Sequence, residues 1–155
     1  VYQLVLCAQK ADIEKVKAGN FFDDPHKEAL KIIINGLIDL DILIGSRDEV
    51  YEKELYKKFF MHRTSHWLGL DVHDVGKYSS KNNPSAVVKF TEGNVLTIEP
   101  GCYIRPSDNV PKEFWGIGVR IEDDVLVTAD GHDVLSKNAP KEINELEAII
   151  GTSSD

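Results

Sequence analysis

Three of the five histidines lie close together in the sequence, at His62, His66 and His73, in a segment that also holds aspartates. Imidazole is a common metal ligand and an acid–base group near neutral pH, and it is a costly residue in an apolar core. A helix or strand that only had to pack would not need this mixture. Residues 59–76 are therefore predicted to form one wall of an active site.

Two glutamates in strand-like sequence could complete such a site. Glu99 ends an apolar run just before Pro100, where a carboxylate at a turn can face a cavity. Arg120 and Glu122 are two positions apart, so in a strand both side chains point to one face. A charge pair inside an apolar strand is expensive unless it is paired or binds a metal. Taken alone, Arg120 and Glu122 also fit a cross-strand ion pair, and a single histidine fits a hydrogen-bonded core residue.

Together, one histidine and two glutamates form an oxygen-rich ligand set. Such sites suit Mn, Co or Mg better than the thiolate sites that favour structural zinc. A dinuclear centre of this kind polarises a carbonyl group, lowers the pKa of a bridging water and stabilises the transition state. The residue types therefore indicate metal-assisted chemistry at a carbonyl.

The composition is that of one globular domain, with 155 residues, 42% of them apolar and 28% charged. A net charge of -8 without a basic stripe argues against a nucleic-acid partner. The apolar runs are shorter than the ~20 residues that span a bilayer, which argues against a membrane partner. Cys7 and Cys102 form no CxxC motif, so they are predicted to be unpaired thiols of a cytoplasmic protein.

Apolar periodicity predicts helices first and strands later. Asp24 is expected to cap the second helix, with Pro25 at its first position, and Pro140 to begin the last helix. Helices are predicted over residues 2–18, 25–44, 47–58 and 140–150. Strands are predicted at 87–90, at 94–99 and twice within 117–128, with loops at 77–85 and 105–113. The fold class is α+β, with helices, then a mostly antiparallel sheet, then a closing helix.

Three motifs closely resemble the bacterial aminopeptidase P family, the Xaa-Pro aminopeptidases. These belong to the pita-bread metallopeptidases, together with prolidase and methionine aminopeptidase. The motifs are HWLGLDVHDVG at 66–76, LTIEPG at 96–101 and GIGVRIEDD at 116–124. The resemblance implies the C-terminal half of a pita-bread (creatinase/aminopeptidase) fold, in which helices pack on a curved, mostly antiparallel sheet. It also implies a hydrolysis reaction. A water molecule between two metal ions would attack the peptide bond before proline and so release the first residue of peptides with proline in second position.

The same resemblance implies three metal ligands, His66, Glu99 and Glu122. Glu122 would bridge both ions, and Glu99 would also be the general base that steers the attacking water. Two Mn²⁺ ions are implied as the cofactor, with Co²⁺ or Zn²⁺ as other candidates.

Four further residues are implied around the substrate. His73 would hydrogen-bond the substrate carbonyl or the developing oxyanion. His62 would line the pocket for the proline ring, and Tyr103 would border the cleft. Arg120 would orient a ligand carboxylate, so that it counts with His62, His73 and Glu99 as a catalytic candidate. The family commonly has Gly where this chain has Arg63.

The resemblance also predicts that the chain is part of a larger catalytic domain. The family's site has five ligands, and the two aspartates that precede these three match no residue here. Residues 1–155 are therefore interpreted as a catalytic domain without its first half and without the N-terminal domain. This part alone would expose apolar surface. It is expected to be inactive alone, to need the missing half as a partner, and to belong to a protein that is a homo-oligomer at full length.

Other functions fit the same residues. Prolidase, which cuts only dipeptides, shares the motifs. A metal-free pita-bread module that acts by binding, or a structural piece that binds nothing, would also keep this fold. The presence of all three ligands argues against a metal-free module. The match around Trp67 and over 117–124 favours aminopeptidase P, whose substrate is a peptide with penultimate proline.

Overall fold

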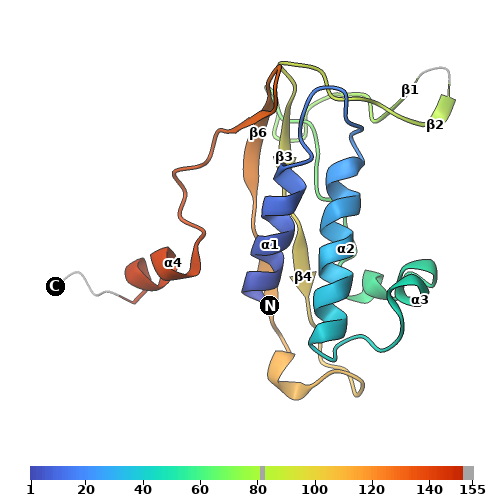
Figure 1. Ribbon diagram of the computed structural model, residues 1–155. Helices are drawn as coiled ribbons and strands as arrows, with labels where there is room; N and C mark the ends of the chain where they lie inside the picture. Colours follow the sequence, from blue (N-terminus) through green and yellow to red (C-terminus); the bar gives the residue numbers. More distant parts are fainter. Residues whose placement is uncertain (81–82, 152–155) are drawn as a thin grey trace.

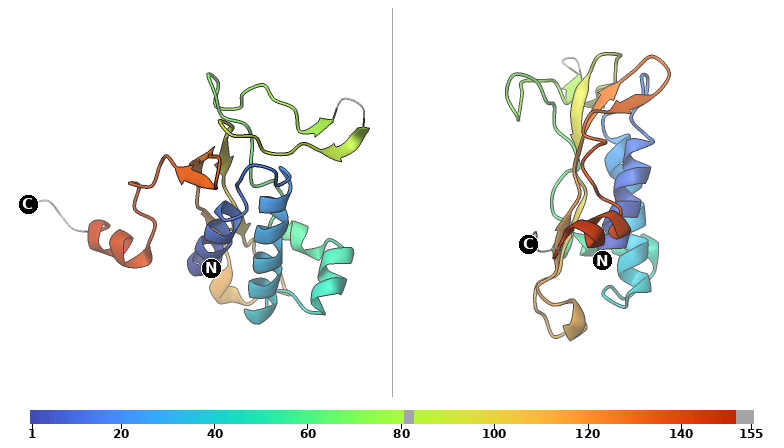
Figure 2. Two further views of the ribbon diagram at one scale, coloured as in Figure 1. Left: turned by 45° about the horizontal axis from the view of Figure 1, so that its top comes forward. Right: turned by 90° about the vertical axis from the view of Figure 1, so that its left-hand side faces the viewer.

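The computed structural model of the chain describes residues 1–80 and 83–151. Two long helices lie side by side over a group of strands (Figure 1), and the view turned by 90° in Figure 2 shows helices on one side and strands on the other. The predicted α+β class, with helices before a sheet, is confirmed. Within the described ranges, no helix is long and apolar enough to cross a membrane.

The first helix, α1 (Tyr2–Ile13), packs against α2 (Asp24–Asp39). The prediction that α1 reaches residue 18 is wrong. The N–H groups of Lys15 and Val16 donate to the carbonyls three residues earlier, at 3.0 and 2.9 Å, which tightens the chain into turns. These turns direct Val16, which is fully buried, into the core under the sheet.

Helix α2 ends at Asp39, so the prediction that it reaches Ile44 is wrong. Beyond the helix, the N–H groups of Ile42 and Leu43 both donate to the carbonyl of Leu37, at 2.9 and 3.0 Å. This turn buries Ile42 and Leu43 and leaves Ile44 83% exposed. The apolar spacing therefore continued past the end of the helix because the following turn packs against the same core.

The second and the last helix begin at other residues than predicted. Asp24 is the first residue of α2, and Asp23 holds the N-cap position without a capping hydrogen bond; the carboxylate of Asp24 accepts the N–H of Phe21 at 2.8 Å. The last helix, α4 (Ile143–Ile149), begins after Pro140, where Glu142 and Glu145 form a capping box. Figure 1 shows α4 at the end of an extended arm beside α1.

The predicted helix over 47–58 is two short ones, α3 (Arg47–Glu52) and the 3-10 helix η1 (Leu55–Lys58). Ser46 caps α3 by accepting the N–H of Glu49 at 3.2 Å. Glu54, with φ at 53°, separates the two helices because an α-helix cannot continue through the left-handed conformation.

All strand pairings among the described residues are antiparallel, in the sets β1–β2, β3–β6–β7 and β4–β5. The strands are β1 (Ser79–Ser80), β2 (Asn83–Val87), β3 (Val95–Ile98), β4 (Gly101–Tyr103), β5 (Gly118–Arg120), β6 (Asp123–Val127) and β7 (His132–Val134). The predictions for 94–99 and for two strands within 117–128 are thus confirmed, to within their ends.

Two predictions in the middle of the chain are only partly right. Of the predicted strand 87–90, Val87 belongs to β2 and Lys89 forms an isolated bridge with Phe21. The predicted loop 77–85 holds β1 and the start of β2, and its residues 81–82 lie outside the described part. The predicted loop at 105–113 is confirmed up to the 3-10 helix η2 (Lys112–Phe114).

Strands β3 and β4 behave as one bent strand that runs opposite β5 and β6. Ile98 faces Asp123 at one end of the bend, and Gly101 faces Arg120 at the other. The two pairs share one register, so the residue after Ile98 faces the residue before Asp123. Glu99 therefore faces Glu122. We call this point the bend, because regular pairing stops there between the two ladders.

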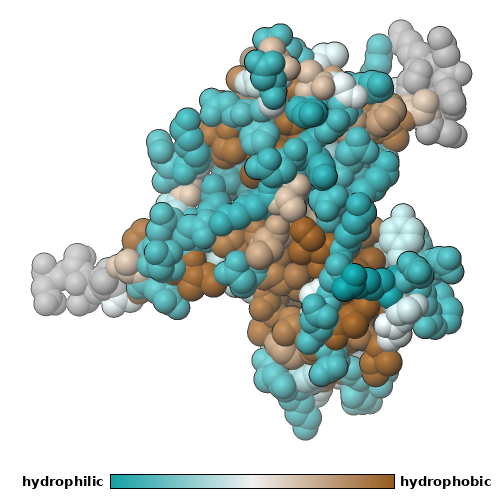
Figure 3. Space-filling model, viewed as in Figure 1, coloured by the Kyte–Doolittle hydropathy of each residue, from teal (hydrophilic) through white to brown (hydrophobic). Residues whose placement is uncertain are grey.

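The apolar core has two parts. One lies between α1, α2 and the β4–β5 ladder and includes the fully buried Cys102, while the other lies under β3 and β6. Cys7 and Cys102 are both free thiols, as predicted. Figure 3 shows that apolar side chains also reach the surface over the lower part of the helical layer.

Candidate metal centre

The three predicted metal ligands come from three neighbouring segments. The stretch that contains His66 runs antiparallel to β3, with the N–H of Thr97 donating to the carbonyl of His66 at 3.0 Å and the N–H of Glu99 to that of Thr64 at 2.7 Å. On its other side β3 pairs with β6, which Glu122 precedes. One ligand atom from each of His66, Glu99 and Glu122 lies within 4.8 Å of the others.

The hydrogen bonds of His66 orient its ring for ligation. Nδ1 lies 3.0 Å from the carbonyl oxygen of Trp67, which can only accept, so Nδ1 carries the proton. In the neutral ring, Nε2 then keeps its lone pair, and it lies 3.4 Å from Oε1 of Glu99. A carbonyl behind the ring is the usual device that fixes the tautomer of a metal-bound histidine.

The two carboxylates are held close together although they repel each other. Burial, followed by the charge of Glu99, raises the pKa of Glu122. Arg120 offsets part of this charge, with Nη1 3.6 Å from Oε2 of Glu99. The ion pair of Arg120 is thus with Glu99 across the bend, and Glu122, with which the sequence also allowed a pair, is the more exposed carboxylate. Two adjacent carboxylates with one unprotonated imidazole nitrogen fit a divalent cation in their donor chemistry.

Thr97 also belongs to the site, although the sequence interpretation gave it no role. Its hydroxyl donates to Oε1 of Glu99 at 3.2 Å and accepts the N–H of His66 at 3.1 Å. Thr97 is 2% exposed on an otherwise apolar strand. A polar residue two positions before Glu99, and so on the same face of the strand, was the available signal.

His62, Tyr103 and Arg120 form a hydrogen-bonded chain at the edge of the site. Nδ1 of His62 donates to the carbonyl of Arg63 at 2.7 Å, so Nε2 accepts the hydroxyl proton of Tyr103 at 2.9 Å. Nε of Arg120 donates to the same hydroxyl at 2.8 Å. Because Arg120 also contacts Glu99, the predicted pocket residues are connected directly to the ligand set.

His73 lies over His66, with the two ring centroids 4.1 Å apart. Asp74 closes the loop that carries it, because its carboxylate accepts the N–H groups of Leu70 and Val75 at 3.1 and 2.8 Å. Gly76 allows the return of the chain, since a Cβ there would lie 1.9 Å from the indole ring of Trp67. The structure thus brings together every residue that the sequence singled out as a site candidate.

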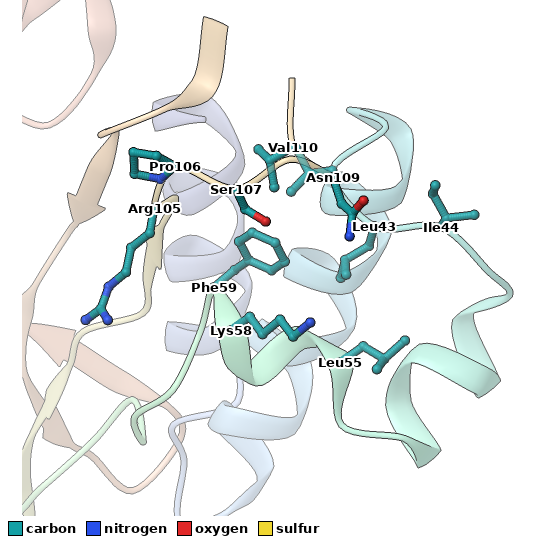
Figure 4. Close-up of a pocket in the computed structure, with 11 residues that line it drawn as sticks. Leu43, Ile44, Leu55, Lys58, Phe59, Arg105, Pro106, Ser107, Asn109 and Val110 are labelled. Carbon is teal, nitrogen blue, oxygen red and sulfur yellow. The ribbon is translucent and has the colours of Figure 1, made fainter. Parts of the chain in front are cut away.

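Two features lie outside this cluster. The guanidinium of Arg63 is bound by the carboxylate of Asp23 at the start of α2, which fixes the side chain that departs from the family pattern. A cavity of about 620 Å³ opens near η1, where Figure 4 shows the Phe59 ring among Leu43, Leu55 and Val110. None of the metal-centre residues lines it.

Known proteins share this sequence and fold. The chain is 43% identical to the Xaa-Pro aminopeptidase of Haemophilus influenzae over 150 residues, which are 97% of this chain and 34% of the relative. Its structure matches Pseudomonas aeruginosa aminopeptidase PepP with a TM-score of 0.91 and 43% identity, over 96% of this chain and 33% of that one. It matches zinc-substituted Escherichia coli aminopeptidase P in complex with product with a TM-score of 0.88 and 39% identity, over the same shares.

The chain therefore spans about a third of the length of the relatives it matches. The sequence profile of metallopeptidase family M24 matches residues 1–129, which include the three motifs and all the candidate ligands. By this match, the chain belongs to metallopeptidase family M24.

Proposed function

We propose that this chain forms the C-terminal half of the catalytic domain of a metal-dependent Xaa-Pro aminopeptidase. The observation that carries the proposal is the convergence of His66, Glu99 and Glu122 within 4.8 Å. The 43% identity to an Xaa-Pro aminopeptidase over 97% of the chain supports the choice of reaction. The remaining ligands would come from the part of the relatives that this chain does not match.

Each candidate residue has a role that its contacts permit. Bound divalent ions, two Mn²⁺ in the complete site, would supply Lewis acidity and an activated water. Glu99 takes the proton of the attacking water, while Arg120 and Thr97 hold its carboxylate in place. His73, exposed on its loop, donates to the substrate carbonyl as negative charge develops. Zinc is an alternative cofactor, since a relative takes it.

The proline side of the substrate would contact the His62–Tyr103–Arg120 chain. The His62 ring packs edge-on to Phe60, with ring centroids 5.4 Å apart, and hydrogen-bonds on both nitrogens. A ring fixed in this way presents a flat wall to a pyrrolidine ring. A solved structure of Escherichia coli aminopeptidase P holds the inhibitor Pro-Leu, which supports a proline-bearing peptide as the substrate.

A chimera tests the proposal. Residues 1–155 replace the matching C-terminal third of the Escherichia coli relative, and hydrolysis is measured with Mn²⁺. The chimera is expected to cleave a Gly-Pro-Ala tripeptide and to leave Gly-Ala-Ala intact. Cleavage of the dipeptide Gly-Pro alone would indicate prolidase instead. A folded chimera that binds Mn²⁺ and cleaves neither peptide contradicts the proposal.

Matched variants show whether the proposed ligands are responsible. Glu122→Gln should abolish cleavage by the chimera, whereas Glu113→Gln, at an exposed position in η2, should not change it. Residues 1–155 alone are expected to be inactive with added Mn²⁺. Cleavage of Gly-Pro peptides by the monomeric chain would contradict the need for a second half.

A further inference from the structure

Asp123, the residue after Glu122, is held by a buried network that the proposed reaction does not use. Its carboxylate is 1% exposed and accepts from Nε2 of Gln9 at 2.5 Å and from Oγ of Ser136 at 2.6 Å. Nζ of Lys141 lies 2.7 Å from Oδ2 and 2.9 Å from Oδ1. Three side chains, one from α1 and two from the residues after β7, therefore converge on one carboxylate.

Two of these partners belong to the C-terminal arm, which we define as residues 135–151. The arm lies along α1, where the hydroxyl of Tyr2 donates to the carbonyl of Lys141 at 2.7 Å and Lys10 pairs with Glu142 at 2.5 Å. The M24 profile ends at residue 129, so Ser136 and Lys141 lie beyond the part that defines the family. The arm follows the part of the chain that the profile matches, and it reaches back to α1 and to Asp123.

The position of Asp123 connects this network to the metal centre. Asp123 faces Ile98 in the last regular pair of the β3–β6 ladder. Beyond that pair the strands part, and Glu122 and Glu99 project from the bend. The backbone of Glu122 is therefore attached directly to the residue that the arm fixes. Ser136 strengthens the attachment, since its Oγ also accepts the N–H of Asp124 at 3.0 Å.

We propose that Lys141 and Asp123 are positioning residues that fix Glu122 for metal binding, so that the C-terminal arm controls the metal centre. The proposal rests on the proposed function only in taking Glu122 as a ligand. The Lys141 side chain is 19% exposed and its partner 1%. Removal of the lysine charge alone would leave a buried, unpaired carboxylate next to the ligand, which forces Asp123 and its neighbours to move.

The test compares Lys141→Met with Lys137→Met in the chain of residues 1–155. Lys137 lies on the same arm but forms an exposed pair with Asp133. Co²⁺ alone is titrated, and its visible absorption gives both the Kd and the geometry of the bound ion. Lys141→Met is expected to raise the Kd for Co²⁺ by about 10–100-fold and to change the spectrum, the range found when outer partners of metal ligands are lost. Lys137→Met should change neither.

A double variant separates positioning from simple loss of stability. Asp123→Asn combined with Lys141→Met removes both charges and keeps one of the two oxygens, Oδ1, to which Ser136 donates, while an amide nitrogen replaces the oxygen to which Gln9 donates. It should bind Co²⁺ more tightly than Lys141→Met alone, because no unpaired charge remains. If Lys141→Met does not fold, Ser136→Ala removes two hydrogen bonds of the network and should also weaken Co²⁺ binding.

Hydrogen exchange without metal keeps this proposal independent of the proposed function. Lys141→Met should speed amide exchange in residues 118–124 relative to Lys137→Met. If wild-type residues 1–155 bind no Co²⁺, the three proposed ligands do not hold an ion without the missing ones, while the exchange data still decide whether the arm fixes this segment. Equal Co²⁺ affinity and equal exchange in Lys141→Met and Lys137→Met would overturn the proposal.

Discussion

Glu99 and Glu122 face each other across the bend in the antiparallel ladder, in the register set by Ile98 with Asp123 and by Gly101 with Arg120. In a continuous ladder, opposed carboxylates would be unfavourable. Here the interruption lets both project to the side where His66 lies. The fold therefore holds two like charges together at the point where the regular backbone pairing of the ladder is interrupted.

Glu122→Gln should change stability in opposite directions with and without metal. Without metal, the loss of one repelling charge should raise the unfolding temperature at neutral pH, because burial and Glu99 raise the pKa of Glu122. With Mn²⁺, the wild-type chain should gain stability and the variant should not. Thermal unfolding with and without Mn²⁺ measures both effects. Glu113→Gln, at an exposed position, is the control and should follow wild type in both conditions.

Tyr103→Phe should remove the hydrogen bonds that connect His62, the proposed proline-pocket residue, to Arg120. The change removes the hydroxyl that joins His62 to Arg120 and keeps the ring. We expect the unfolding free energy to fall by about 1 kcal/mol and peptide cleavage by the chimera to fall by about 10-fold. Tyr51→Phe is the control, because Tyr51 is 56% exposed and outside the site. Equal activity of the two variants would contradict a role for the hydroxyl.

Stability should fall as the pH is lowered through the titration range of His26. Burial, and then the charge of Arg63, lowers the pKa of His26 from 6.5 to about 4. Between these values the unfolded chain binds the proton and the folded chain does not, so stability is present above pH 6.5 and is lost towards pH 4. The loss is about 3 kcal/mol.

His26→Leu should flatten this part of the pH profile. Urea unfolding at a series of pH values measures the free energy for both proteins. Above pH 7 the two curves should run parallel, which serves as the internal control. A wild-type curve that is no steeper than that of His26→Leu between pH 4 and 6.5 would show that His26 is not buried in its neutral form.

Asp12→Asn should stabilise the protein at neutral pH. Asp12 is 0% exposed, and neither of its carboxylate oxygens makes a hydrogen bond within 3.5 Å. Burial raises its pKa well above 3.8, although Thr64 lowers it. The contribution of Asp12 to stability is therefore present at low pH and is lost as the pH rises.

The advantage of Asp12→Asn should accordingly grow from pH 4 to pH 7 in chemical unfolding experiments. Asp39→Asn is the matched control, because Asp39 is exposed at the end of α2. An Asp12→Asn variant that is less stable than wild type at pH 7 would show that the carboxylate has a compensating partner in solution.

The proximity of the three proposed ligands was predictable from sequence because its signals are local. Glu99 and Glu122 stand at the ends of β-branched runs, and His66 lies in a segment with unusual composition. Strand alternation then places the side chains, without knowledge of the tertiary fold. The pairing of Arg120 with Glu99 was not predictable in this way, because it depends on how the two strands face each other.

The helix ends and the buried network around Asp123 could not be predicted. Periodicity does not distinguish a helix from a following turn that packs on the same core, as Ile42 and Leu43 show after α2. Gln9 and Lys141 are far from Asp123 in the sequence, and each looks like an ordinary surface residue there. Only the tertiary fold reveals that they share one carboxylate.

The network around Asp123 also has a consequence for the order of folding. It joins Gln9, near the beginning of the chain, to Lys141, near its end. Contacts between such distant residues are slow to form, because a long loop must close before they stabilise anything. During synthesis α1 emerges long before its partner lysine. Under the proposal above, Glu122 is fixed for metal binding only after Lys141 has left the ribosome, later than all three proposed ligands themselves.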